Sequence, residues 1–255
     1  MMNYTNTTTE LFLSGIDTAV IPIGATEQFG PYLPMHLDTL IAELYATEYG
    51  KALNAYVLPV LPFNTSEEHA ALKGTVTVSP QIISAFVEDI IVNLRRQGFK
   101  KFLIASGHGG SYWIGSFIKH MNYVYQDIVV IHPHHQPNAW DDAVKAAGFE
   151  GRNEIHGGLI GVCTAMFLCP QYVKDLSSAG SEIPIAFNKF ADYVSWDKLT
   201  QDGNWGHFVS GQYSTEELAE KGRKLWMTLI NKNCDGLKEH IDEAYSMKTG
   251  QHSKP

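Results

Sequence analysis

Short apolar segments alternate with helical patterns along this chain, and this alternation restricts the fold more than any other feature. Residues 20–23, 55–62, 101–106 and 128–132 are apolar runs typical of buried strands. Residues 79–97 place Ile82, Phe86 and Ile90 at every fourth position, which predicts a helix. Further helices are expected from Asp38, from near Ser111, over residues 157–168 and over residues 215–240. Such alternation predicts an α/β fold with a parallel sheet covered on both faces.

The length of the chain favours one domain over residues 1–255. Its 255 residues can bury a sizeable core, and no Gly/Ser/Pro-rich linker or charge block divides them. The ordinary composition, 44% hydrophobic and 18% charged, confines expected flexibility to the tails at residues 1–9 and 248–255.

Charge and cysteine content exclude several classes of partner. The formal net charge of −8 argues against a nucleic-acid surface. No apolar run reaches the roughly 18 residues of a membrane helix, so no membrane partner is expected. The three cysteines form no CxxC pair, which fits a protein of the reducing cytoplasm. A small-molecule substrate is the expected partner.

Polar side chains follow two of the predicted strands. Glu27 and Asp38 come after the first strand, and His108, in the run GHGG, follows the third. In an open α/β sheet these connections lie at the edge where ligands bind. Two carboxylates and an imidazole suit zinc, manganese or ferrous iron. The alternative is that the carboxylates cap helices and that the GHGG glycines only let a strand turn into a helix.

His156, in the run NEIHGG, precedes an apolar helical segment and has Glu154 two residues before it. This arrangement is typical of a catalytic acid or base. A histidine that donates to a backbone carbonyl in the core is an equally valid interpretation.

Four segments, in order along the chain, together resemble the creatininase (creatinine amidohydrolase) family. GATEQFGPYLPMHLD at residues 24–38 is similar to the family's GxxEQHGPHLP run and its following Asp. EEHAALKGTVT from Glu67 is similar to EHxxFPGT, and SGHGGS from Ser106 to NGHGGN. The segment from Asp202, DGNWGHFVSGQYSTEELAEKGRKL, is similar to a GxWGDP run with its ATAEKG helix.

The resemblance implies a three-layer α/β/α sandwich with a mostly parallel central sheet, commonly assembled into hexamers. It also implies an active site of one or two divalent metal ions that hydrolyses small amides. In the family pattern one ion is held by residues that correspond here to Glu27, Asp38 and His108. The second ion uses the histidine of EQHG, here Phe29, and an acid at positions that are here Gly110, Leu159 and Gly161. One divalent ion per chain is therefore expected.

Other residues near these motifs are candidates for the same site. His36 lies two residues before Asp38 and would replace the missing nitrogen ligand if the segment is extended; otherwise it faces substrate or the surface. Tyr32, Trp205 and His207 are expected in the pocket wall, with the alternative that Trp205 packs a subunit contact.

These features together predict a metal-dependent hydrolase of a small cyclic amide, a formamide or a related carbonyl compound, with His156 transferring the proton. Two other functions stay open. One is a mononuclear enzyme that acts on a polyol or keto sugar by hydrolytic C–C cleavage, isomerisation or elimination. The other is a metal-free binding protein on the same scaffold. A homo-oligomer, most simply a hexamer, is expected in each case.

Overall fold

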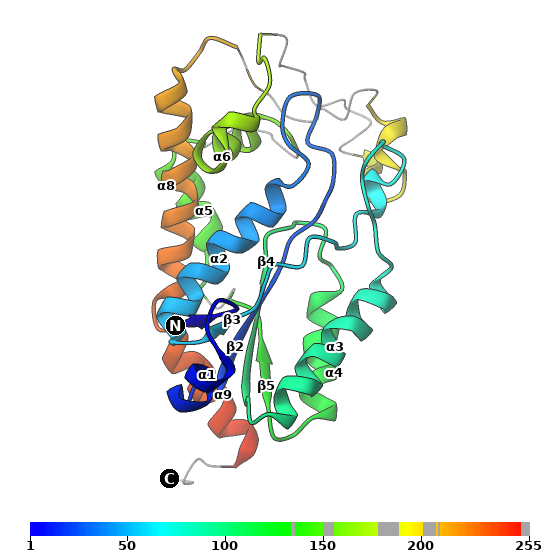
Figure 1. Ribbon diagram of the computed structural model, residues 1–255. Coiled ribbons are helices and arrows are strands. Elements are labelled where there is room, and N and C mark those ends of the chain that lie inside the picture. Colours follow the sequence, from blue (N-terminus) through cyan, green and yellow to red (C-terminus); the bar gives the residue numbers. More distant parts are fainter. Residues whose placement is uncertain (134–135, 150–155, 178–188, 201–207, 209, 251–255) are drawn as a thin grey trace.

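A parallel sheet forms the centre of the computed structural model, which describes residues 1–133, 136–149, 156–177, 189–200, 208 and 210–250 (Figure 1). Within these residues the sheet has five strands in the order β1-β3-β2-β4-β5, and every pair is parallel. The strands are β1 (Met2–Asn3), β2 (Thr18–Ile23), β3 (Tyr56–Val57), β4 (Lys101–Ser106) and β5 (Val129–Ile131).

Alternate residues of the central strands enter two cores, as the period of a strand requires. Ile21 of β2 and Ile104 of β4 face α3 (Pro80–Arg96) and α4 (Ile114–Val124). Val20 and Leu103 enter the opposite core. That core is covered by α2 (Leu37–Leu53), α5 (Ala139–Ala146), α6 (Leu159–Leu168), α8 (Thr215–Cys234) and α9 (Leu237–Thr249). Helices therefore cover both faces, which confirms the predicted α/β/α sandwich (Figure 1).

Some elements differ from the sequence prediction. The strand expected over residues 55–62 is reduced to β3 and one bridge between Ile23 and Leu61, because Pro59 and Pro62 have no N–H for a ladder. The helix expected over residues 215–240 is divided into α8 and α9 at Gly236, whose φ is +65°.

The amino-terminal segment, expected to be flexible, contains secondary structure. Residues 2 and 3 pair with β3, and α1 (Thr8–Ser14) begins with a capping box between Thr7 and Glu10. Three 3₁₀ turns complete the described elements: η1 (Glu67–His69), η2 (Pro170–Tyr172) and η3 (Trp196–Lys198). Among the described residues, no helix is both long enough and apolar enough to cross a membrane.

Two glycines let α2 begin directly against the carboxyl ends of β2 and β4. A Cβ on Gly107 would lie 2.2 Å from the carbonyl oxygen of Asp38 and 2.5 Å from the backbone nitrogen of Ala42. A Cβ on Gly24 would lie 2.4 Å from Cα of Thr39. Only glycine fits at either position, and this close approach brings the first turn of α2 against the loop that carries His108.

Candidate metal centre

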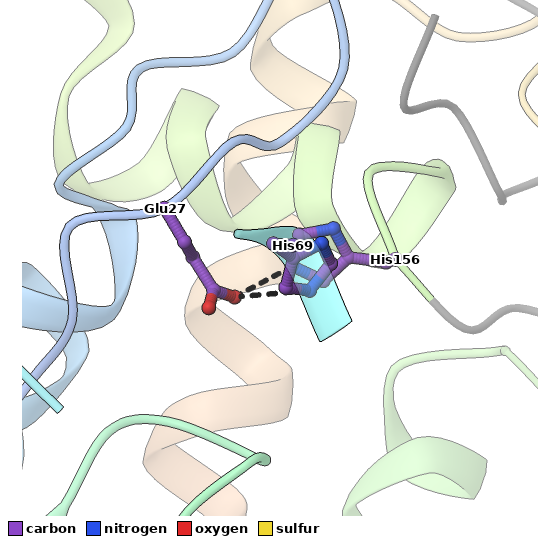
Figure 2. A group of neighbouring side chains, drawn as sticks. All are labelled: Glu27, His69 and His156. Carbon is purple, nitrogen blue, oxygen red and sulfur yellow. Dashed lines mark hydrogen bonds and ion pairs between the residues drawn. The ribbon is translucent and has the colours of Figure 1, made fainter. Parts of the chain in front are cut away.

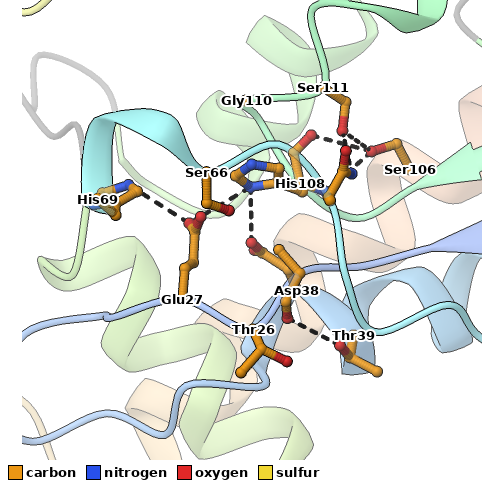
Figure 3. A network of polar contacts seen from close by, with 12 residues as sticks. Thr26, Glu27, Asp38, Thr39, Ser66, His69, Ser106, His108, Gly110 and Ser111 are labelled. Carbon is orange, nitrogen blue, oxygen red and sulfur yellow. Dashed lines mark hydrogen bonds and ion pairs between the residues drawn. The ribbon is translucent and has the colours of Figure 1, made fainter. Parts of the chain in front are cut away.

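Glu27, Asp38 and His108 converge at the carboxyl edge of the sheet, as Figure 3 shows. Nδ1 of His108 lies 2.9 Å from Oδ2 of Asp38 and 3.5 Å from Oε1 of Glu27. All three side chains are at least nine-tenths buried. The structure thus brings together the three residues that the sequence analysis names as ligands.

A hydrogen bond to the backbone fixes which nitrogen of His108 faces the carboxylates. Its Nε2 lies 2.6 Å from the carbonyl oxygen of Thr65, which can only accept, so Nε2 carries a proton. In the neutral imidazole, Nδ1 then presents its lone pair to the carboxylates. Oε2 of Glu27 and Oδ2 of Asp38 are buried without an aligned hydrogen bond. Acceptors that face each other in this way need a cation between them, and this donor set fits zinc, manganese or ferrous iron.

The electrostatics of the cluster show the same need for positive charge. Burial disfavours the imidazolium form of His108, but the carboxylates of Asp38 and Glu27 outweigh it and raise the pKa of His108 to about 10. Burial and the charge of Glu27 raise the pKa of Asp38 to about 6. Burial raises the pKa of Glu27 as well, but a hydrogen bond from His156 and three nearby imidazoles lower it to about 2. Without a metal, a proton on His108 serves as the cation.

A second group lies on the other side of Glu27. Oε1 of Glu27 is 2.9 Å from Nε2 of His156 and 3.7 Å from Nε2 of His69. Figure 2 draws both contacts. These three ligand atoms are close enough together to hold an ion. Glu27 is therefore common to both groups.

The tautomer of His69 argues against metal binding at this second group. The backbone N–H of Gly30 donates to Oε1 of Gln28, which turns the amide nitrogen of Gln28 toward Nδ1 of His69 at 2.9 Å. Nδ1 therefore accepts, and the proton of the neutral ring sits on Nε2, facing Glu27. Burial, the main cause, lowers the pKa of His69 to about 3, so the ring is neutral. Because a metal ligand needs a lone pair at Nε2, His69 is better suited to orienting Glu27.

His156 comes three residues before α6, beside Glu27. Its ring stacks on Phe29, with centroids 4.1 Å apart. The hydroxyl of Tyr32 donates to the carbonyl oxygen of Gly157 at 3.0 Å and so holds the neighbouring backbone. The side chain of His156 remains 12% exposed, which leaves it in reach of a ligand.

The other candidates are placed as follows. His36 lies just before α2 with its ring edge-on to Tyr172, at 5.5 Å, and belongs to neither group of possible ligands. Tyr32 is 2% exposed and contributes through its bond to Gly157. Glu154, Trp205 and His207 lie outside the described residues.

The sequence analysis missed His69 and Trp196. His69 lies inside the EEHAALKGTVT motif, and that motif was the available signal. Trp196 packs edge-on against His69, with centroids 4.5 Å apart, and no sequence pattern marks it.

Comparison with known proteins identifies the family. The model of the family described as "Creatininase: Creatinine amidohydrolase" matches residues 2–236. The chain belongs to the creatininase family.

Two curated relatives illustrate the range of the family. A mycofactocin precursor peptide peptidase from Mycolicibacterium smegmatis is 32% identical over 107 residues, which is 38% of this chain and 42% of that protein. The alignment thus spans less than half of that relative. A creatinine amidohydrolase from Pseudomonas putida is 25% identical over 66% of this chain and 70% of its own length.

Solved structures of the family share the fold over the whole chain. A putative creatinine amidohydrolase from Bacteroides fragilis has a TM-score of 0.73 and is 25% identical, covering 100% of this chain and 98% of its own. Two creatininase structures at 20% identity, one a mutant named as a Zn-Zn type and one named for Mn, have TM-scores of 0.72 and 0.71 and cover 94% of this chain and 98% of their own.

This member of the creatininase family lacks the side chains that the family pattern places around a second ion. A Cβ on Gly110 would lie 2.5 Å from Nε2 of His108 and 2.7 Å from Oε1 of Glu68, so an acidic side chain at Gly110 would displace both. Phe29 presents an apolar ring where the family pattern has a histidine. Leu159 is buried in the core. Phe29, Gly110 and Leu159 therefore offer no side-chain ligand at these positions of the family pattern.

Proposed function

We propose that the protein is a hydrolase of a small amide or related carbonyl compound, with one divalent ion held by Glu27, Asp38 and His108. One observation carries this proposal: Nδ1 of His108 and oxygens of two buried carboxylates converge, and the carbonyl oxygen of Thr65 holds Nε2 of the same ring away from them. An ion at these ligands would polarise a substrate carbonyl and lower the pKa of water.

The chain's own residues supply the remaining steps. The carbonyl oxygen of Thr65 holds the ring of His108 in its tautomer, and His69 orients Glu27 from the opposite side. His156 is partly exposed, and its Nε2 lies 2.9 Å from Oε1 of Glu27, so the ring is held beside the proposed metal ligands. His156 would accept a proton from the attacking water and pass it to the leaving group.

Metal analysis of the purified protein tests the site. We expect about one divalent ion per chain, zinc, manganese or iron, because only one of the two groups offers three lone pairs. Asp38→Ala should lose both the ion and activity. Asp89→Ala, a matched change on the exposed side of α3, should keep both.

The results that contradict the proposal are distinct. Two tightly bound ions per chain would show that His69 and His156 are ligands. Full metal content in Asp38→Ala would show that the ion binds elsewhere. A screen of lactams, formamides and keto-inositols tests the reaction, and turnover of keto-inositols alone would favour a sugar-directed enzyme. Purified protein without metal would favour a binding protein.

A further inference from the structure

A pocket of about 660 Å³ leads away from the metal centre. Asp38, His108 and His156 line one end of it. Asp38, Ile41 and Tyr45 lie on one face of α2 and all contact the pocket. At 1.5 Å per residue, this wall runs about 10 Å from the ligand Asp38 along the helix. We call this space the chamber.

Aromatic and aliphatic side chains form the wall beyond the metal centre. The ring of Trp226 lies 5.7 Å from that of Tyr45 and 6.0 Å from that of Trp140. The indole N–H of Trp226 donates to the hydroxyl of Thr164 at 2.8 Å, so it presents a carbon surface to the chamber. Ile41, Ile160 and Leu229 complete this surface.

The charged side chains of the chamber lie at the metal centre and at the mouth. Among the described residues that line it, the charged ones are Asp38, His108 and His156 at the metal centre and Asp141 at the first turn of α5. Asp141 and the neighbouring Asn138 are exposed, which places them at the mouth. A ligand that reaches from the metal centre along α2 therefore meets mostly carbon.

We propose that the chamber binds an aromatic or branched aliphatic group of the substrate, joined to the scissile amide within about 10 Å. This inference rests on the proposed function and adds the substrate class. Apolar groups gain by leaving water for such a wall, and pockets of this volume hold ligands larger than a single small ring. A polyol would lose hydrogen bonds to water along this wall without replacing them.

Binding of hydroxamates to the zinc-loaded protein tests the chamber without turnover. Hydroxamates chelate the ion, so a series of them can present different substituents to the chamber while the metal-binding group stays the same. By calorimetry, 3-phenylpropionohydroxamate should bind at least about tenfold more tightly than acetohydroxamate, since it buries a ring. Gluconohydroxamate should gain nothing over acetohydroxamate. Equal affinities for all three would overturn the proposal.

Substitution of Ile160 locates the effect. Ile160→Trp fills the chamber and should weaken binding of the phenyl compound by at least about tenfold, with acetohydroxamate unchanged. Ile90→Trp is the matched control, since Ile90 is also half-buried but lies in α3 across the sheet. If Ile160→Trp does not fold, Ile160→Asn replaces an apolar side chain with a polar one of the same number of heavy atoms and should weaken binding of the phenyl compound alone. Unchanged affinity in a folded variant would place the phenyl group elsewhere.

Hydrolysis of two formamides separates this inference from the proposed function. N-formylphenylalanine should be cleaved with a higher kcat/KM than N-formylglycine. Tight binding of the phenyl hydroxamate with cleavage of no amide would support the chamber and contradict the hydrolase. Equal cleavage of both formamides, with equal hydroxamate affinities, would contradict the chamber and support the hydrolase.

Discussion

Metal binding should release a proton from His108. In the metal-free protein the carboxylates of Asp38 and Glu27 raise the pKa of this ring to about 10, so at pH 7 Nδ1 is protonated. An ion at Nδ1 must displace that proton. At pH 7, three units below the pKa, the competition weakens zinc binding about a thousandfold, or about 4 kcal/mol at 1.36 kcal/mol per unit.

Calorimetry in buffers of different protonation enthalpy measures the release directly. We expect about one proton per zinc ion at pH 7, and an affinity that rises about tenfold per pH unit from pH 6.5 to 8.5. His120→Gln, an exposed histidine of α4, should behave like the unaltered protein. Zinc binding that releases no proton and does not depend on pH would refute the claim that Nδ1 of His108 is protonated in the metal-free protein.

The same shift predicts how the stability of the metal-free protein depends on pH. The raised pKa of His108 stabilises the fold fully below about 6.5, its value in the unfolded chain, and this contribution is lost as pH rises toward 10. Between pH 7 and 9 the free energy of unfolding should therefore fall. His108→Gln should show a smaller slope in denaturant titrations over that range, and an identical slope would count against the shift.

Three further predictions concern the rest of the site and the assembly. Gly110→Ala should destabilise the protein by about 1–3 kcal/mol and weaken zinc binding, because its methyl group would lie 2.5 Å from Nε2 of His108. In the control Gly109→Ala the methyl group meets nothing within 4 Å, so neither stability nor zinc binding should change. Equal melting temperatures of the two variants would contradict this prediction. His156→Ala should lower turnover about a hundredfold or more with metal content unchanged, and loss of metal would make His156 a ligand instead. Light scattering should give a hexamer, and a fully active species near the 28.4 kDa of one chain would reject it. If Trp205 serves a subunit contact, Trp205→Ala should dissociate in light scattering and should also lose activity.

The sequence predicts most of the fold because its strands are buried on both faces. β4 has the bounds expected, and β2 extends the expected run by two residues. The prediction fails where backbone chemistry overrides apolar content. Prolines shorten the strand at residues 55–62, and Gly236 divides the last helix. Neither change alters the hydrophobic pattern, so periodicity alone does not reveal them.

Only part of the site was accessible from sequence. Glu27, Asp38 and His108 follow strand ends, and the order of a parallel sheet brings such positions together. His69 reaches Glu27 from a 3₁₀ turn, whose position depends on loop packing and not on strand order. The hydrogen bonds that fix the tautomers of His69 and His108 come from Gln28 and from a backbone carbonyl, and these require coordinates.

The close contact between Gly107 and α2 holds the backbones of two of the proposed ligands against each other. Asp38 and His108 lie on backbone segments that touch, so these backbones cannot move apart unless the helix moves off the sheet. Zinc needs ligand bonds of about 2.0–2.2 Å, whereas calcium needs about 2.3–2.6 Å and more oxygen ligands. We therefore expect zinc to bind more tightly than calcium. The glycine that permits the fold would contribute to this preference by holding the two backbones close, although it would not touch the ion.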